Sequence, residues 1–135
     1  RMNDEEIATH NAIGEYHTGN IHPLLHEIRH ALRSLLQTGE STTIDLRSLP
    51  MAPGEQEELL ELLGRGEISA TLEALGTSEV IETAYAGVWL IFHYNSNREV
   101  MGKFIEINRI PEILESHTEE IEEALTSLQN RLKEL

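Results

Sequence analysis

The sequence predicts an α+β domain, with helices packed against an antiparallel sheet of four or five strands. Residues 64–94 hold three short runs rich in β-branched and aromatic side chains, separated by Gly-Thr and Ala-Gly steps. That pattern is typical of consecutive antiparallel strands. Leucine-rich stretches with helical spacing lie before and after these runs, at residues 21–37 and 121–135. Strands and helices therefore occupy separate parts of the chain, which favours α+β over alternating α/β.

Two helices and one short strand are predicted before the main strand region. Residues 21–37 place apolar side chains at helical spacing, with Pro23 near the start and Gly39 just past the end. Residues 53–63 begin with a proline, carry glutamates near the positive helix N-terminus and stop at Gly64. The β-branched run at residues 41–46 predicts a strand between the two helices.

Four further strands are predicted at residues 67–72, 79–83, 88–94 and 99–108. In a strand, successive side chains point to opposite faces of the sheet. The third run therefore presents two different surfaces, one made by Val88, Leu90, Phe92 and Tyr94 and the other by Trp89, Ile91 and His93. In the fourth run, Ile105 and Ile107 face one way, and Phe104 and Glu106 face the other.

A C-terminal amphipathic helix is expected after Pro111. Ser116, with Glu119 three residues later, matches a capping box. Beyond it, apolar side chains step by four and three: Ile121, Leu125, Leu128, Leu132 and Leu135. This stripe covers only about two heptads, less than a free coiled coil usually needs. We expect it to dock on the domain or on a second copy of the chain, which would make a homodimer.

The expected organisation is a loosely ordered N-terminal segment, residues 1–20, followed by one domain spanning residues 21–135. A chain of 135 residues is long enough for a single core but short for two. The first residue is Arg1, which points to a processed product, a tagged product or part of a longer protein.

The charge balance restricts the partners. A formal net charge of −14, with only ten Lys and Arg, argues against nucleic acid and against anionic membrane surfaces. A protein partner would be neutral or basic on its docking face. The chain has no cysteine, which excludes disulfides, iron–sulfur clusters and thiolate zinc sites within it. With no stretch resembling a membrane span or signal peptide, we expect a cytoplasmic location.

The best candidates for partner binding lie around the third strand of residues 64–94: Tyr85, Gly87, Trp89 and His93. An exposed Tyr and Trp pair at a strand-entry turn would give a partner much contact area at low entropic cost. The alternative is that Trp89 or Tyr85 is simply a core residue. His93 and Glu82 also suggest an acid–base pair across a hairpin, but no nucleophile or oxyanion donor accompanies them. We therefore predict no catalytic residues and no enzyme.

A second candidate site lies on the first helix, where His22, His26 and His30 are spaced four residues apart and line one helix face. Two histidines at this spacing can bind a transition metal. Arg29 and Arg33 beside them oppose a divalent cation, and no further ligand is evident. A solvated helix face is the simpler interpretation, so neither a metal nor another cofactor is predicted.

Longer strings carry a family resemblance. LLHEIRHALRSLLQTGE, IDLRSLPMAPGEQEELLELLGRGEISATLEALG and SEVIETAYAGVWLIFHYN, at residues 24–40, 44–76 and 78–95, resemble the HupH/HyaF family of hydrogenase expression/formation proteins. The string FIEINRIPEIL, residues 104–114, resembles the conserved C-terminal region of that family. The combination of LGRGEISATL with ETAYAGVW is long and unusual, which makes the resemblance specific.

The resemblance implies a cytoplasmic, non-catalytic accessory protein of [NiFe]-hydrogenase biogenesis. Such a protein would act as a chaperone-like factor that binds a hydrogenase subunit precursor or other accessory proteins. Members of the family are commonly longer, often with a second related region. The alternative function is a nickel- or iron-handling protein that uses the histidine-bearing helix face.

Overall fold

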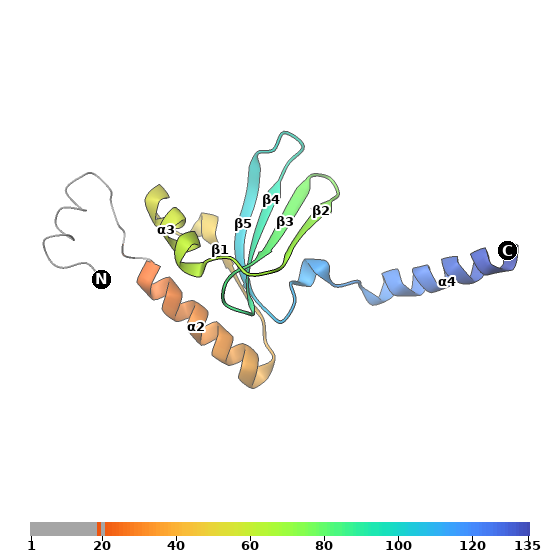
Figure 1. Cartoon of the computed structure of the whole chain (residues 1–135), viewed down its shortest axis with the longest axis horizontal. Helices are drawn as coiled ribbons and strands as arrows, with labels where there is room; N and C mark the ends of the chain where they lie inside the picture. Colours follow the sequence, from red (N-terminus) through yellow and green to blue (C-terminus); the bar gives the residue numbers. More distant parts are fainter. Residues whose placement is uncertain (1–18, 20) are drawn as a thin grey trace, which may run out of the picture.

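A five-stranded antiparallel sheet organises the chain, with strand order β1-β5-β4-β3-β2 (Figure 1). The computed structural model describes residue 19 and residues 21–135, so the prediction for the N-terminal segment lies outside the described residues. The strands are β1 (Thr42–Asp45), β2 (Ser69–Glu73), β3 (Thr77–Glu82), β4 (Val88–Tyr94) and β5 (Val100–Ile107). Three α-helices accompany them: α2 (Ile21–Thr38), α3 (Pro53–Leu63) and α4 (Thr118–Glu134). The predicted α+β class and antiparallel sheet are confirmed.

Helices α2 and α3 cover one face of the sheet and form the first core with it. This core buries apolar side chains of both helices against inward-facing residues of β1, β4 and β5: Leu24, Ile28, Ala31, Leu35, Ile44, Leu59, Leu63, Val88, Leu90, Ile105 and Ile107. The strand register explains the arrangement, because Ile105 lies opposite Ile44 on one side and Leu90 on the other. The hydrophobic stripes of the helices and the alternating strand residues thus meet in one layer.

Local signals set the ends of α3. Pro53 occupies the first turn, and the Glu55 carboxylate accepts a hydrogen bond from the Ala52 backbone N–H at 3.1 Å. The helix stops where Gly64 takes φ +68, a conformation that favours glycine. Its predicted bounds are confirmed, as are those of β4.

Two short 3₁₀ turns, η1 (Leu46–Ser48) and η2 (Glu112–Leu114), were not predicted. η1 follows β1 and is capped by Asp45, whose side chain accepts a hydrogen bond from the Arg47 N–H at 2.9 Å. η2 follows Pro111 and brings Leu114 onto the second face of the sheet.

The second face carries a smaller core. Val80, Trp89 and Ile91 are buried there, and the partly buried residues packed on them are Ala70, Leu72, Phe104 and Leu114. Among the described residues, only Leu114 comes to this core from outside the sheet. The second face is therefore much less covered than the first.

Helix α4 extends away from the sheet, with the C-terminus at its far end (Figure 1). None of its residues is buried. The expectation that its apolar stripe docks on its own domain is therefore wrong. The predicted cap is also displaced by one residue, because the Glu120 carboxylate, not Glu119, accepts a hydrogen bond, from the His117 N–H at 3.0 Å. Within the described residues, no helix is long and apolar enough to cross a bilayer.

Candidate functional site

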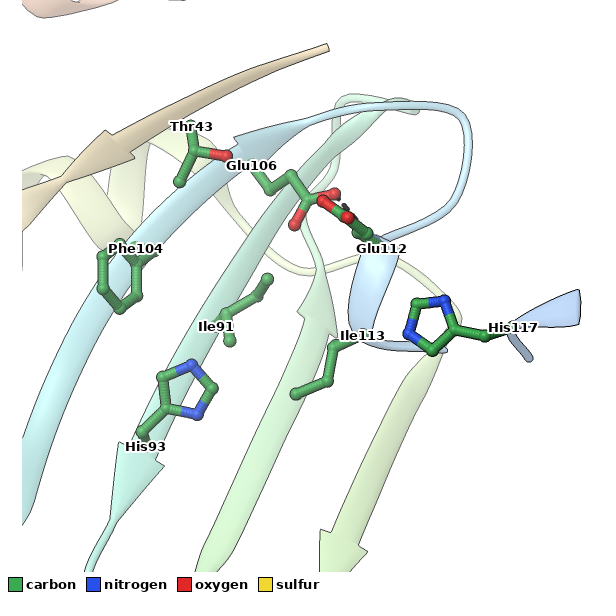
Figure 2. A pocket seen from close by; sticks show the side chains of 8 residues that line it. All are labelled: Thr43, Ile91, His93, Phe104, Glu106, Glu112, Ile113 and His117. Atoms are coloured by element: carbon green, nitrogen blue, oxygen red, sulfur yellow. Dashed lines mark hydrogen bonds between the residues drawn. The ribbon is translucent and has the colours of Figure 1, made fainter. Parts of the chain in front are cut away.

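The second face of the sheet holds a hollow of about 350 Å³, shown in Figure 2. β4 and β5 form its floor, β1 borders it on one side, and the chain from η2 to the start of α4 closes the other side. The lining residues are Thr43, Ile91, His93, Phe104, Glu106, Glu112, Ile113 and His117. We call this set the sheet groove. Its floor exists because odd-numbered residues of β4 and even-numbered residues of β5 point to this face.

Glu106 connects the floor of the sheet groove to its rim. Its side chain is only 7% exposed, and its Oε2 accepts hydrogen bonds from the Glu112 N–H at 2.9 Å and the Asn108 Nδ2 at 3.0 Å. The bond from the Glu112 N–H ties η2 to β5. A buried carboxylate with two donors is a stable arrangement, whereas a buried carboxylate without partners would be costly.

Replacing Glu106 is expected to loosen this rim. Glu106→Ala leaves the Glu112 N–H and the Asn108 amide without their acceptor, which costs about 1 to 3 kcal/mol in unfolding free energy. Urea denaturation measures that loss, and hydrogen exchange should quicken at the Glu112 amide. Glu106→Gln, which keeps one acceptor oxygen, should retain most of the protection. Equal exchange at Glu112 in wild type and Glu106→Ala would contradict this role.

His93 lies on the groove floor in a fixed orientation. Its Nδ1 is 2.7 Å from the Ser78 Oγ, and its ring meets the Phe104 ring edge-on with centroids 5.7 Å apart. Ser78 is its partner across the β3–β4 ladder, whereas Glu82 lies opposite Trp89. The hypothetical His93–Glu82 pair is therefore wrong, because the hairpin register places Glu82 four positions away from Ser78.

The predicted aromatic pair at the strand entry is only half right. Tyr85 is 54% exposed, but Trp89 is 4% exposed and belongs to the second core. The Trp89 Nε1 donates to the Asn108 carbonyl at 3.0 Å, which satisfies the one polar atom of the indole. Of the two alternatives for Trp89, the core residue is confirmed and the exposed anchor is wrong, because odd-numbered β4 residues face the second core.

Gly87 has a clear conformational role. Its φ is +90, and a Cβ there would lie 3.3 Å from the Leu32 Cδ2. The β3–β4 turn therefore favours glycine where it approaches α2. Gly87 also lines a different hollow, of about 470 Å³, together with Leu32, Leu35, Leu36, Ala86 and Arg109. The four predicted partner-binding residues thus do not form one patch: His93 lies in the sheet groove, Gly87 beside α2, Trp89 in the core, and Tyr85 exposed in the turn between β3 and β4.

The histidine stripe lies on the exposed side of α2. His22, His26 and His30 are all solvent-exposed, and the first two rings meet edge-on with centroids 4.7 Å apart. Across the part of the chain that the structure describes, no group of three or more His, Asp or Glu side chains is arranged to hold a metal ion.

Elsewhere, burial and then the nearby Glu79 raise the pKa of Tyr94 above its ordinary value of 10.0, which favours the neutral phenol.

Sequence reasoning missed most of the groove. Alternation in the last strand had separated Phe104 and Glu106 from Ile105 and Ile107, and that division is confirmed. It did not reveal which face the helices leave open. Thr43 joins the groove through the pairing of β1 with β5, and Ile113 joins it through the η2 turn; no local sequence pattern indicates either.

Comparisons with known proteins agree on one family. Residues 18–135 match the model of the HupH hydrogenase expression protein, C-terminal conserved region. The hydrogenase expression/formation protein HoxQ of Azotobacter vinelandii is 28% identical over 123 residues, covering 86% of this chain and 42% of that protein. The HupH protein of Rhizobium leguminosarum bv. viciae is 27% identical over 94 residues, covering 70% of this chain and 33% of that protein.

A solved structure is also similar over most of the chain. The hydrogenase expression protein HupH from Thiobacillus denitrificans shares 43% sequence identity, with a TM-score of 0.84. The alignment covers 89% of this chain and all of that one. The chain spans less than half the length of the curated relatives it matches. The matched residues, the identities and the common fold place this chain in the HupH hydrogenase expression protein family, within its C-terminal conserved region.

Proposed function

We propose that this chain is a non-catalytic, chaperone-like accessory protein of [NiFe]-hydrogenase biogenesis that acts in the cytoplasm. Its partner would be a hydrogenase subunit precursor or another maturation factor. Family membership supports this proposal, since the similar proteins are named for hydrogenase expression and formation. Because those curated relatives are more than twice as long, the proposal concerns what this region contributes.

The sheet groove is the surface that we assign to partner binding. The observation that carries this assignment is a hollow on the sparsely covered face of the sheet that is partly apolar, with Ile91 and Phe104 on its floor and Ile113 on its rim. Apolar surface that the fold leaves open is a common mark of protein-binding sites. The groove is also concave, and polar side chains converge on it, which are further features of binding sites.

Charge defines the kind of segment that fits. Glu106 and Glu112 stand at one end of the groove, and the whole chain carries a net charge of −14. An apolar segment that is neutral or basic would be attracted, and an acidic one repelled. Among the predicted contact residues, His93 would touch the partner directly, and Tyr85 would offer an exposed ring. Gly87 and Trp89 would shape the turn and the sheet.

Two isoleucines near η2 provide a matched test. Ile113 is 39% exposed and lines the groove, whereas Ile110 is 43% exposed and lies outside its lining. Ile113→Glu should weaken binding of a hydrogenase subunit precursor at least about tenfold, the loss expected for a hot-spot residue that becomes charged. Ile110→Glu should bind like wild type. Both side chains are partly exposed, so both variants should fold.

The measurement is capture of purified large-subunit and small-subunit precursors by the immobilised chain, with affinities from biolayer interferometry. A loss confined to Ile113→Glu supports the groove and identifies the client. Equal binding by wild type and both variants would reject the groove while leaving the accessory role intact. If wild type binds neither precursor nor any purified maturation factor, the proposed function itself is wrong.

A further inference from the structure

Helix α4 carries an apolar stripe that nothing in the described chain covers. Its five residues are all well exposed: Ile121 57%, Leu125 58%, Leu128 60%, Leu132 62% and Leu135 86%. The stripe lies on a helix that projects from the sheet (Figure 1). A helix with one apolar face is normally stabilised by burying that face, because a short isolated helix is only marginally stable in water.

The spacing of the stripe suits another helix. Its residues follow each other at intervals of four, three, four and three, which is the a/d pattern of a coiled-coil seam. Such a seam is narrow and straight along a helix, and it accepts the side chains of a facing helix between its own. A flat sheet face would instead favour a broader apolar surface.

The distribution of charge along α4 favours one orientation of two paired α4 helices over the other. The first half of the helix carries Glu119, Glu120, Glu122 and Glu123, and the second half carries Arg131 and Lys133 with a single glutamate, Glu134. A parallel pair of α4 helices would place the four glutamates of one copy beside those of the other. An antiparallel pair places the acidic half beside the basic half, and the helix dipoles then also oppose each other favourably.

The position of α4 in the chain gives a second reason. Each sheet domain is attached at the N-terminal end of α4, immediately after His117. A parallel pair would hold two strongly acidic domains side by side, which their mutual repulsion opposes. In an antiparallel pair the domains lie at opposite ends of a helix about 25 Å long.

We propose that two copies of this chain associate through the apolar stripes of α4, packed antiparallel about a two-fold axis. The interface is isologous: the same stripe serves both copies, and each acidic half meets the other copy's basic half. The seam spans only about two heptads, so association is expected to depend on protein concentration. The resulting dimer presents two partner-binding surfaces instead of one. This inference does not depend on the identity of the hydrogenase partner.

The first experiment measures the mass of the whole chain in solution. Sedimentation velocity at roughly 100 µM protein should show a dimer, and Leu128→Glu should leave a monomer, because a charge at the centre of the seam cannot be buried without a partner. Leu75→Glu is the matched control, since Leu75 is fully exposed between β2 and β3 and should remain dimeric. α4 buries none of its own residues, so Leu128→Glu should not unfold the sheet.

Wild-type monomer at this concentration would overturn the proposal, whatever covers α4 in its place. So would a dimer that Leu128→Glu leaves unchanged. Near-ultraviolet circular dichroism of Trp89, the one tryptophan, verifies that each variant keeps its core.

The second experiment determines the orientation, and it uses the absence of cysteine from the chain. In an antiparallel pair Ile121 of one copy lies near Leu132 of the other and far from its own equivalent. Disulfides require Cβ atoms about 3.5 to 4.5 Å apart. A mixture of Ile121→Cys and Leu132→Cys chains should therefore oxidise to a mixed disulfide, and Ile121→Cys alone should not. Rapid self-cross-linking of Ile121→Cys would show a parallel pair and overturn the antiparallel assignment.

Discussion

Trp89→Ala is expected to reduce the unfolding free energy by about 3 to 5 kcal/mol, the range for removing a large aromatic side chain from a core. Trp89 is 4% exposed, packs with Val80 and Ile91, and donates its Nε1 hydrogen bond to Asn108. Truncation leaves a cavity in the second core and removes the donor from the Asn108 carbonyl. Chemical denaturation followed by far-ultraviolet circular dichroism measures the loss without relying on tryptophan fluorescence.

Two further variants separate the core role from a binding role. Trp89→Phe keeps most of the apolar volume and loses the hydrogen bond, so it should cost less than Trp89→Ala. Tyr85→Ala removes a side chain that is 54% exposed and should change stability by no more than about 0.5 kcal/mol. If Trp89→Ala were as mild as Tyr85→Ala, the indole would not be part of the core, and its assignment as a partner anchor would regain support.

The first and last residues of some elements could be predicted from the residue types at their ends. α3 is bounded by Pro53 and Gly64, which each restrict the backbone independently of the rest of the fold. β4 is bounded by the turn at Gly87 and by the polar residues after Tyr94. The cap of α4 was less certain, because the neighbouring residues Ser116 and His117 each have a glutamate three positions later. The structure has the later pair, in which the Glu120 carboxylate accepts from the His117 N–H.

The sheet groove was not predictable from local patterns. Alternation in β4 and β5 divides their side chains between two faces, yet it does not state which face the helices cover. That depends on β1 joining β5, a pairing between segments about sixty residues apart. The burial of Trp89 likewise depends on residues distant in the sequence, because β2, β3, β5 and Leu114 of η2 all contribute side chains to the second core.

Within the first core, truncation of Ile105 should reduce the unfolding free energy most, because its strand β5 lies between β1 and β4. Ile105 is fully buried, and its strand neighbours Ile44 and Leu90 are buried with it beneath α2 and α3. Ile105→Ala is expected to cost about 2 to 5 kcal/mol in unfolding free energy, and Ile105→Val only about 0.5 to 1.5 kcal/mol. Urea denaturation monitored by Trp89 fluorescence measures both, with Ile110→Ala as the exposed isoleucine control.

Variants at Ile105 and Ile113 should affect stability and partner capture differently. Ile105 belongs to the face that α2 and α3 close, so its truncation should lower stability and reduce partner capture only as far as the protein unfolds. Ile113 belongs to the sheet groove, so Ile113→Glu should reduce capture while the denaturation midpoint stays near that of wild type. A shift of both properties in both variants would mean that the two faces of the sheet are not energetically separable. That result would contradict the assignment of capture to the sheet groove.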